Sequence, residues 1–501
     1  MKKLYQAVLF VLLCCLTPLV ANAQSFRVQC PTSTITHPTA ANNNSEPPYT
    51  VSGVNGAIKC QQISGGDGYA TMGDGTQTYL FSFGPLSGLT DIANGLPGTQ
   101  FPSVFNTVYA GATPLQPGDP ATNGVNFNGA VGLTPDVDAI AGGGCVAPCL
   151  DGHVDPRPIM DVGVMNGNIP APLMAIDEDD EFFLTLTNVG MIMRPDLFEQ
   201  HTVHFHGYPN ASAFYDGVPD ASVAINIGAS FTYYYLAPDA GTYFWHCHIT
   251  PPEHLQMGMV GQLYVRPRQN RITGNLYTGL QQQQLDLRTA CNSATDILCS
   301  NPLPAVNTGA TGGGKYAYND GDGSTAYDVE YPIQIHGFDP NFHFVGMTFN
   351  PEGFADMKDK YFLLNGRSYP DTVTPGPLQT ASADGTNHFS QPLPSIINIP
   401  AGKKALLRIS DLDVSEYQTL ASLGIPMKVI GYNAKLLRDQ AGNNLYYTTN
   451  SITLAGGESL DVILDSTGIP PGTYYLYTPN LDHLSNDAEN FGGLMTEVHV
   501  L

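Results

Sequence analysis

The chain has 501 residues with 20 basic and 44 acidic side chains, which gives a formal net charge of −24. This excess of acids argues against nucleic acid and anionic membrane surfaces as partners, because it would repel their phosphate groups. No stretch after residue 23 reaches the roughly 18 to 20 apolar residues that a membrane-spanning helix needs. We therefore expect no membrane span, and the length allows two or three domains.

The first 23 residues have the three parts of a secretory signal. Two lysines precede an apolar run over 7–20, and the small residues ANA at 21–23 suit a cleavage site. We expect an exported protein, periplasmic or extracellular, whose mature chain begins at Gln24.

Seven cysteines remain after this signal is removed, and an odd number sets one thiol apart. Pairing of neighbours in chain order is the simplest disulfide pattern for an oxidising compartment. It joins Cys30 to Cys60, Cys145 to Cys149, and Cys291 to Cys299. Cys247 is left over, so its thiol is a candidate for a special chemical role.

Short β-rich runs between Gly and Pro residues dominate the chain, which is typical of an all-β sandwich. We expect an irregular N-terminal segment over 24–75 and a β-rich domain over 76–266 with an aperiodic insertion at about 85–160. A Gly-rich linker over 267–327 then leads to a second β-rich domain over 328–501. The phrase GTYFW at 241 recurs as GTYYL at 472, which suggests two copies of one domain type.

Two histidine-rich segments, HTVHFHG at 201–207 and WHCHI at 245–249, carry the strongest chemical signal. Side chains alternate between the faces of a strand, so His204 and His206 share the face opposite to His201. In the second segment two histidines flank Cys247 and share the face opposite to it. If the segments are neighbours, four histidines lie on one side and a histidine with a cysteine on the other. The pattern therefore predicts two metal sites back to back.

The site on the cysteine side can be completed by His254 and Met259, which follow Cys247 in an H-x4-M step. One thiolate, two imidazoles and a weak axial thioether form the ligand set of a blue-copper electron-transfer centre. Met257 is a competing choice for the axial position, or either methionine packs in the core. Four imidazoles on the opposite face suit copper ions that bind oxygen species, and only the adjacent backbone separates them from Cys247.

These segments resemble the multicopper oxidase family, which is built from cupredoxin domains and includes laccases and ascorbate oxidases. The resemblance covers roughly 165–265 and 328–501 and implies two cupredoxin-like Greek-key β-sandwich domains. It also implies the copper ligands. They are His201, Cys247, His254 and axial Met259 at type 1 copper, His204 at type 2 copper, and His206, His246 and His248 at type 3 copper. The segment FYDGVP at 214–219 is similar to the family's Asp-Gly segment, which would make Asp216 a catalytic acid that moves protons to reduced oxygen.

Three features depart from the family pattern. The loop from Cys247 to His254 is two residues longer than usual, in the direction of copper nitrite reductases. The first domain offers four histidines where a full trinuclear cluster needs eight, and the second domain lacks copper ligands. The cluster is therefore reduced, or a single type 2 copper, or shared with a neighbouring subunit across a symmetric interface. His336 stands alone because Gln334 occupies the partner position, so we expect it to be structural.

We expect a copper-dependent oxidoreductase that takes single electrons near His254, whose imidazole edge should be the most exposed ligand, and reduces oxygen at the histidine cluster. The donor is a small molecule such as a phenol, a metal ion such as Fe²⁺, Mn²⁺ or Cu⁺, or a redox protein. We also expect a homo-oligomer.

Two alternatives stay open. One is a nitrite-reductase-like enzyme, although Pro479 stands where those enzymes place a neighbouring subunit's histidine, and His483 lies four residues further on. The other is a non-enzymatic blue-copper electron-transfer protein with a degenerate oxygen site. Outside the sites, we expect Trp245 in the core and the acidic run DEDDE at 177–181 in solvent.

Overall fold

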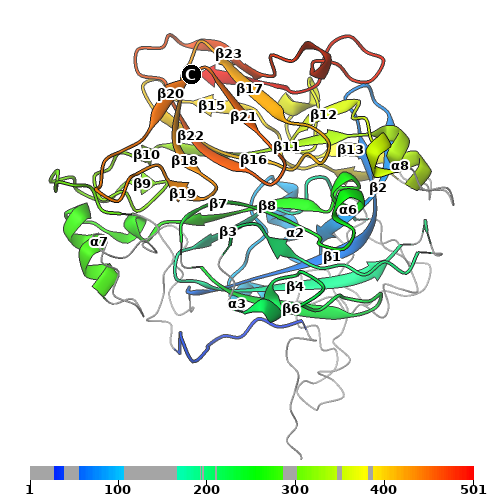
Figure 1. Cartoon of the computed structure of the whole chain (residues 1–501), viewed down its shortest axis with the longest axis horizontal. Coiled ribbons are helices and arrows are strands. Elements are labelled where there is room, and N and C mark those ends of the chain that lie inside the picture. Colours follow the sequence, from blue (N-terminus) through cyan, green and yellow to red (C-terminus); the bar gives the residue numbers. More distant parts are fainter. Residues whose placement is uncertain are drawn as a thin grey trace, which may run out of the picture.

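The computed structural model describes residues 28–38, 56–106, 166–285, 302–346, 353–381 and 387–501, apart from gaps at 192, 195–196, 209–211 and 238. Over these residues the protein consists of two β-sandwiches, which lie one above the other in Figure 1. The all-β expectation is confirmed. The predicted signal over 1–23, most of the predicted insertion, and the cysteines at 145, 149, 291 and 299 lie outside the described residues.

The first sandwich has two four-stranded sheets, with strand orders β2-β1-β4-β6 and β3-β8-β7-β5. A shared apolar core includes Phe81, Phe205 and Trp245. The strands are β1 (Ile58–Thr71), β2 (Gln77–Pro85), β3 (Met174–Asp177), β4 (Glu181–Gly190), β5 (His204–Phe205), β6 (Ser230–Leu236), β7 (Gly241–His246) and β8 (Val260–Arg266).

Strand β1 corrects the prediction that residues 24–75 are irregular. It has 14 residues, pairs with both β2 and β4, and is almost entirely buried. Its sequence IKCQQISGGDGYAT lacks apolar alternation and is rich in glycine, so local propensity indicates a loop. The glycines allow close packing, since a Cβ on Gly68 would lie 2.1 Å from the carbonyl oxygen of Gly167. The predicted disulfide between Cys30 and Cys60 is confirmed and ties residues 28–38 to this strand.

The second sandwich has a sheet of order β12-β11-β16-β22-β18-β19, to which β20 adds at β18, and a five-stranded sheet of order β15-β24-β23-β17-β21. Aliphatic side chains such as Ile335, Leu407 and Val462 fill its core. The strands are β11 (Val329–Phe338), β12 (Tyr361–Leu364), β15 (Ile397–Ile399), β16 (Lys404–Asp411), β17 (Gln418–Leu423), β18 (Met427–Tyr432), β19 (Lys435–Leu436), β20 (Tyr447–Thr449), β21 (Ser451–Leu454), β22 (Ser459–Asp465), β23 (Gly472–Tyr477) and β24 (Met495–Val500).

Two small hairpins and a few short helices complete the described structure. The hairpin strands are β9 (Lys315–Tyr316) with β10 (Ala326–Tyr327), and β13 (Leu378–Ala381) with β14 (Asn387–Ser390). The helices are α2 (Leu89–Ala93), α3 (Pro102–Phe105), α6 (Pro251–Gln256), α7 (Leu276–Leu285) and α8 (Pro340–Gly346), with 3-10 turns η3 (Ala213–Tyr215), η4 (Arg268–Arg271), η5 (Phe354–Asp356), η6 (Asp371–Val373) and η7 (Leu481–His483). No helix of the described residues is long and apolar enough to cross a membrane.

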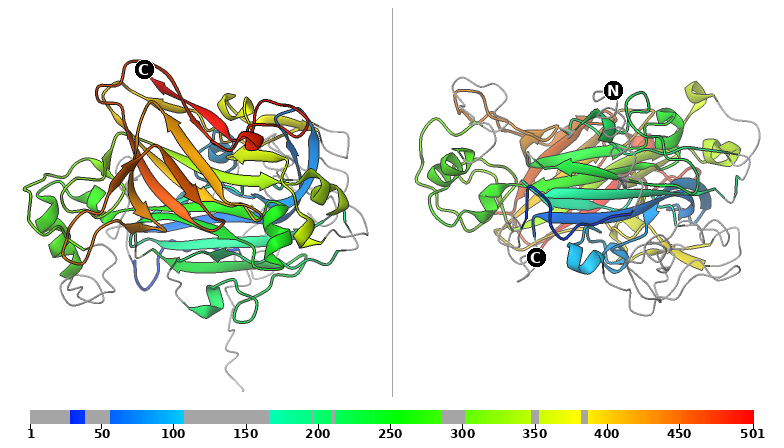
Figure 2. Two further views of the ribbon diagram at one scale, coloured as in Figure 1. Left: turned by 45° about the horizontal axis from the view of Figure 1, so that its top comes forward. Right: turned by 90° about the horizontal axis from the view of Figure 1, so that it is seen from below.

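The sheet that holds β7 lies between the two domains. Strand β7 packs against β16 and β22 of the second sandwich, and both views of Figure 2 keep the green and orange sheets adjacent. The buried hydroxyl of Thr242 donates to the Asp461 carboxylate at 2.6 Å across this interface. Residues on β7 are therefore enclosed by their own core on one side and by the second domain on the other.

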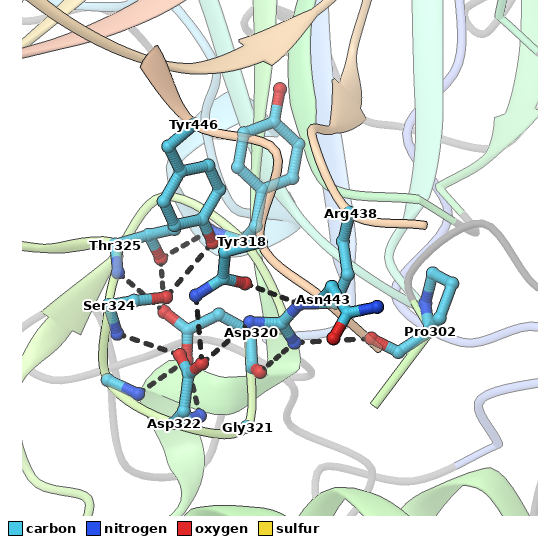
Figure 3. Close-up of polar contacts among 12 residues, drawn as sticks. Pro302, Tyr318, Asp320, Gly321, Asp322, Ser324, Thr325, Arg438, Asn443 and Tyr446 are labelled. Carbon is cyan, nitrogen blue, oxygen red and sulfur yellow. Dashed lines mark hydrogen bonds and ion pairs between the residues drawn. The ribbon is translucent and has the colours of Figure 1, made fainter. Parts of the chain in front are cut away.

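The predicted linker over 267–327 is folded against the second domain where it is described. In Figure 3, Arg438 reaches the carbonyl oxygens of Pro302 and Asp320 and the Asp322 carboxylate. The Asp320 carboxylate in turn accepts the backbone N–H groups of Asp322 and Thr325. Because both carboxylates are saturated by protein donors, this Asp-Gly loop serves to attach the linker.

The acidic run at 177–181 is buried except for the partly exposed Asp179, which corrects the expectation of a solvated segment. Asp177 accepts from Arg266 at 2.7 Å, and Asp180 lies 2.8 Å from the Lys59 ammonium. Burial of a charge is tolerated when it is paired and hydrogen-bonded. The basic partners come from β1 and β8, so the sequence around the run does not reveal them.

Candidate metal centre

Strands β5 and β7 lie side by side, with His204 opposite His246 and Phe205 opposite Trp245. This pairing sorts the candidate ligands as strand alternation predicts. On one side, ligand atoms of His201, Cys247 and His254 all lie within 4.8 Å of one another, and all three side chains are buried. We call this group, with Met259, the cysteine site.

On the other side, ligand atoms of His204, His206 and His246 also lie within 4.8 Å of one another. The ring of His248 is 5.2 Å from that of His204 and 5.4 Å from that of His246, measured between ring centroids. We call these four residues the histidine site. Trp245 points away from it into the core, as expected, and its ring lies 5.0 Å from that of Phe83.

The cysteine site leaves ring nitrogens without protein partners. His201 is completely buried, and neither of its ring nitrogens is hydrogen-bonded. Nδ1 of His254 lies 3.3 Å from the sulfur of Cys247, and the backbone N–H of Thr202 donates to the same sulfur at 3.4 Å. An unpaired buried polar group is costly, so the pocket fits a metal ion that would bind the His201 imidazole. Its thiol, two imidazoles and a nearby thioether are the donors that copper prefers.

The electrostatics of the cysteine site also suit a cation. Burial lowers the pKa of His201 well below its usual value, which keeps the imidazole neutral and its lone pair available. Burial would likewise lower the pKa of His254, but attraction to Cys247 and Glu199 outweighs it and raises the pKa to about 9. Positive charge is therefore stabilised beside Cys247.

His254 differs from the sequence-based expectation, because it is not an exposed ligand. Its side chain is completely buried, and Nε2 lies 3.5 Å from the carboxylate of Glu199, whose side chain is 26% exposed. The longer loop forms helix α6, which turns the ring inward, and Glu199 covers the ring edge. The surface above His254 is thus formed by Glu199.

Met259 is held at the cysteine site by backbone hydrogen bonds. Its N–H donates to the His254 carbonyl oxygen at 2.8 Å, and its own carbonyl accepts from Cys247 at 3.1 Å. A Cβ on Gly65 of β1 would lie 2.7 Å from Cδ2 of His201 and 3.3 Å from the methyl carbon of Met259. The absence of a side chain at Gly65 therefore makes room for two candidate ligands. The sequence signal for this residue is a Gly-Gly pair in a strand, which marks close approach.

The histidine site is more open than the cysteine site. His206 is exposed and His248 is half-buried, whereas His246 is buried. Nδ1 of His246 contacts the Cys247 carbonyl oxygen at 2.7 Å, and Nδ1 of His204 contacts the Asp216 carbonyl oxygen at the same distance. These contacts leave Nε2 of each ring for a metal ion.

Charge and burial keep part of the histidine site neutral. Burial lowers the pKa of His246 to about 3, and partial desolvation of the exposed His206 ring lowers the pKa of that residue as well. The carboxylate of Asp216 lies 3.5 Å from Nδ1 of His204, so this residue is placed at the site by both its carbonyl and its side chain.

The second domain reaches the histidine site through a glycine. Nδ1 of His206 lies 3.4 Å from the Gly457 carbonyl oxygen, and a Cβ on Gly457 would be 2.7 Å from that nitrogen. Thr202 joins the two sites, because its hydroxyl accepts from the His248 N–H at 2.9 Å while its own N–H faces the Cys247 sulfur. Sequence reasoning missed both residues, since neither is a metal-binding type.

His336 and His483 of the second domain have structural contacts, as expected for His336. Nε2 of His336 donates to the Leu255 carbonyl oxygen, and His483 is buried against Gln418 and the Phe362 ring. Among the described residues, groups of three or more His, Cys, Asp or Glu donors close enough to hold a metal occur only in the first domain.

Residues 152–270 match the family model described as multicopper oxidase. This region is thus similar to multicopper oxidases. Laccase abr2 of Aspergillus fumigatus is 34% identical over 109 residues, which are 21% of this chain and 17% of that protein. The copper-containing nitrite reductase of Rhizobium meliloti is 33% identical over 114 residues, 22% of this chain and 27% of that protein.

The chain spans about a fifth of the length of the laccases and multicopper oxidases it matches. The structure of the blue copper oxidase of Nitrosomonas europaea is 17% identical, covers 88% of this chain and 85% of its own, and has a TM-score of 0.49. The region that matches the family model, residues 152–270, contains every candidate ligand in both sites.

Proposed function

We propose that this protein is an exported copper oxidoreductase of the multicopper oxidase type. The observation that carries the proposal is the buried His201 imidazole, unpaired at both nitrogens and within 4.8 Å of the Cys247 and His254 donor atoms. His201, Cys247, His254 and Met259 would hold type 1 copper, and His204, His206, His246 and His248 would hold type 2 or type 3 copper. When bound, copper supplies one-electron redox chemistry and oxygen activation.

The residues around the cysteine site define where a donor would give up its electron. The buried His254 ring lies behind Glu199, so a donor would approach over that carboxylate. Phenols, Fe²⁺, Mn²⁺, Cu⁺ and a redox protein are all candidate donors. Cys247 lies in one site, and its chain neighbours His246 and His248 lie in the other, so the path between the sites is a single stretch of backbone.

Oxygen reduction needs protons as well as electrons, and Asp216 is the proposed acid. Its carboxylate is partly exposed and stands 3.5 Å from the His204 ring. It could therefore exchange protons with water and pass them toward the ligands of the histidine site. The exposed His206 supports a further proposal, that a second copy of the chain covers this face and completes a cluster.

Copper loading of the purified protein tests the proposal. We expect an intense visible thiolate-to-copper band, more than one copper per chain by metal analysis, and oxygen uptake in the presence of a phenolic dye or Fe²⁺. A copper-loaded protein without the visible band would contradict the assignment of the cysteine site.

A nitrite-reductase-like activity is the second candidate, and the longer loop from Cys247 to His254 favours it. The burial of His483 inside the second domain weighs against it, because that side chain is not presented to a neighbouring subunit. Two coppers per chain with nitrite turnover would support this candidate. One copper without oxygen or nitrite turnover would indicate an electron-transfer protein.

A further inference from the structure

Helix α6 carries the ligand His254 and is held by the second domain. Nε2 of His336 on β11 donates to the Leu255 carbonyl oxygen at 3.0 Å, and Nε2 of His343 on α8 lies 2.9 Å from the Gln256 carbonyl oxygen. These two carbonyls belong to the residues that directly follow His254. Two histidines of the domain without copper ligands thus contact the backbone beside a copper ligand of the other domain.

The side chain of Gln256 makes two more contacts with the second domain. Its amide nitrogen donates to the Asp359 carboxylate at 3.0 Å, and its amide oxygen accepts from the Asp339 N–H at 2.9 Å. Gln256, His336 and His343 are at most 1% exposed. Four buried polar contacts therefore converge on two consecutive residues, and we call this set of contacts the α6 clamp.

Elementary helix energetics explain why α6 needs the clamp. The helix has only six residues, far too few to be stable alone, so its geometry depends on contacts from outside the helix. His336 adds a second donor to the Leu255 carbonyl oxygen, which also accepts from the Gly258 N–H at 3.0 Å. The His343 ring lies between two carbonyl oxygens, those of Gln256 and Tyr79, at 2.9 and 2.6 Å from its two nitrogens. The geometry of α6 therefore depends on the second domain as well as on the backbone hydrogen bonds at its own end.

The α6 clamp affects two candidate ligands, His254 and Met259, because Met259 follows the end of α6 by three residues. The His254 carbonyl accepts from the Met259 N–H at 2.8 Å, so a shift of Leu255 or Gln256 would move both the imidazole and the thioether. Colour and reduction potential of a blue-copper site depend on its axial ligand and its surroundings.

We propose that Gln256, His336 and His343 are positioning residues that set the orientation of His254 and Met259 toward copper at the cysteine site. This inference rests on the proposed function, since it assumes that copper binds there. It assigns the second domain a role in redox tuning even though its described residues offer no copper site.

A matched set of variants in the full chain tests the inference. His336→Leu removes the N–H donor, whereas His336→Gln keeps a donor near the same place, and Gln256→Met removes the amide without changing the length of the side chain. Thr242→Val is the control, because it deletes a buried interdomain hydrogen bond, to Asp461, at the opposite end of β7. The measurements are the visible band, the copper hyperfine coupling, the reduction potential and the thermal midpoint.

We expect His336→Leu and Gln256→Met to shift the band and the potential and to weaken copper binding about tenfold. His336→Gln should restore the wild-type values, and Thr242→Val should lower only the thermal midpoint. Equal midpoint losses with an unchanged band and potential in all variants would overturn the inference. If His336→Leu does not fold, the band and the potential of Gln256→Met test the inference instead. Failure of the proposed function is recognised separately, because the wild-type protein would then lack the band.

Discussion

The two sandwiches contain a strand with the same opening phrase but in opposite surroundings. Strand β7 begins GTY at Gly241 and all six of its residues are buried, whereas β23 begins GTY at Gly472 and exposes Tyr475. Strand β7 lies against the second domain, and β23 lies in the outer five-stranded sheet. Strand β7 ends at His246 and is followed by Cys247 and His248, whereas Thr478, Pro479 and Asn480 follow β23.

The difference indicates why the candidate ligands lie in the enclosed domain. An enclosed strand end excludes water, and its side chains are held by packing on both sides. The second domain contributes this enclosure through the α6 clamp, to which His336 and His343 belong, and through Gly457. We interpret it as the support for the metal-binding domain. The variants below test whether the first domain binds the metal and the second domain supports it.

Removal of the thiol should have the largest effect. Cys247→Ser keeps the size of a fully buried side chain but removes the soft sulfur donor, so we expect loss of the visible band and of donor oxidation. Circular dichroism should show an unchanged fold, with at most a loss of about 1–3 kcal/mol in the free energy of unfolding from the buried hydroxyl. Unchanged oxidation would refute the proposed electron path through Cys247.

The contact between Gly457 and His206 should have the next largest effect. Gly457→Ala places a methyl group 2.7 Å from Nδ1 of His206 on a backbone with a φ of +89°. We expect at least about a tenfold lower oxygen consumption, corresponding to about 1.4 kcal/mol, with an unchanged visible band.

Gly402→Ala is the matched control for this variant, because its φ is +73° and no atom lies within 4 Å of the added methyl group. Both variants carry the cost of a left-handed alanine, but only Gly457→Ala should impair oxygen reduction. Equal turnover in the two variants would show that the second domain does not influence the histidine site.

A smaller effect is expected at Gly65, on the side of the first domain's own core. Gly65→Ala would push against His201 and Met259, so we expect a loss of about 1–3 kcal/mol in the free energy of unfolding and a shifted visible band. Gly274→Ala, where no atom lies within 4 Å, is the control. A wild-type spectrum in Gly65→Ala would show that these ligands relax without changing the site.

The prediction with the smallest effect on copper chemistry concerns the pH dependence of stability in the metal-free protein. Burial lowers the pKa of His343 from 6.5 to about 3, and nearby His336 lowers it slightly further. Below pH 6.5 the His343 side chain binds a proton in the unfolded chain but not in the folded chain. The free energy of unfolding therefore falls as the pH drops toward 3.

His343→Gln should reduce this slope by up to about 1.4 kcal/mol per pH unit. Urea unfolding of both proteins between pH 6.5 and 4 measures the difference, and parallel curves would contradict it.

Local patterns in the sequence predict the ligand grouping once the two histidine-rich segments are neighbours. Strand alternation depends only on backbone geometry, so the pairing of β5 with β7 places His201 with Cys247 and His204 with His246. The free thiol of Cys247 follows from the odd number of cysteines, and the disulfide between Cys30 and Cys60 follows from pairing of neighbours in chain order. The all-β class follows from short β-rich runs between Gly and Pro residues.

Only the tertiary structure decided how those ligands are surrounded. Strand β1 forms despite its glycines because close packing requires them, and the acidic run at 177–181 is buried because Lys59 and Arg266 reach it from other strands. The burial of His254 and its support by His336 and His343 depend on contacts between domains. These contacts join residues roughly 80 to 90 positions apart in the chain, and local patterns carry no information about such partners.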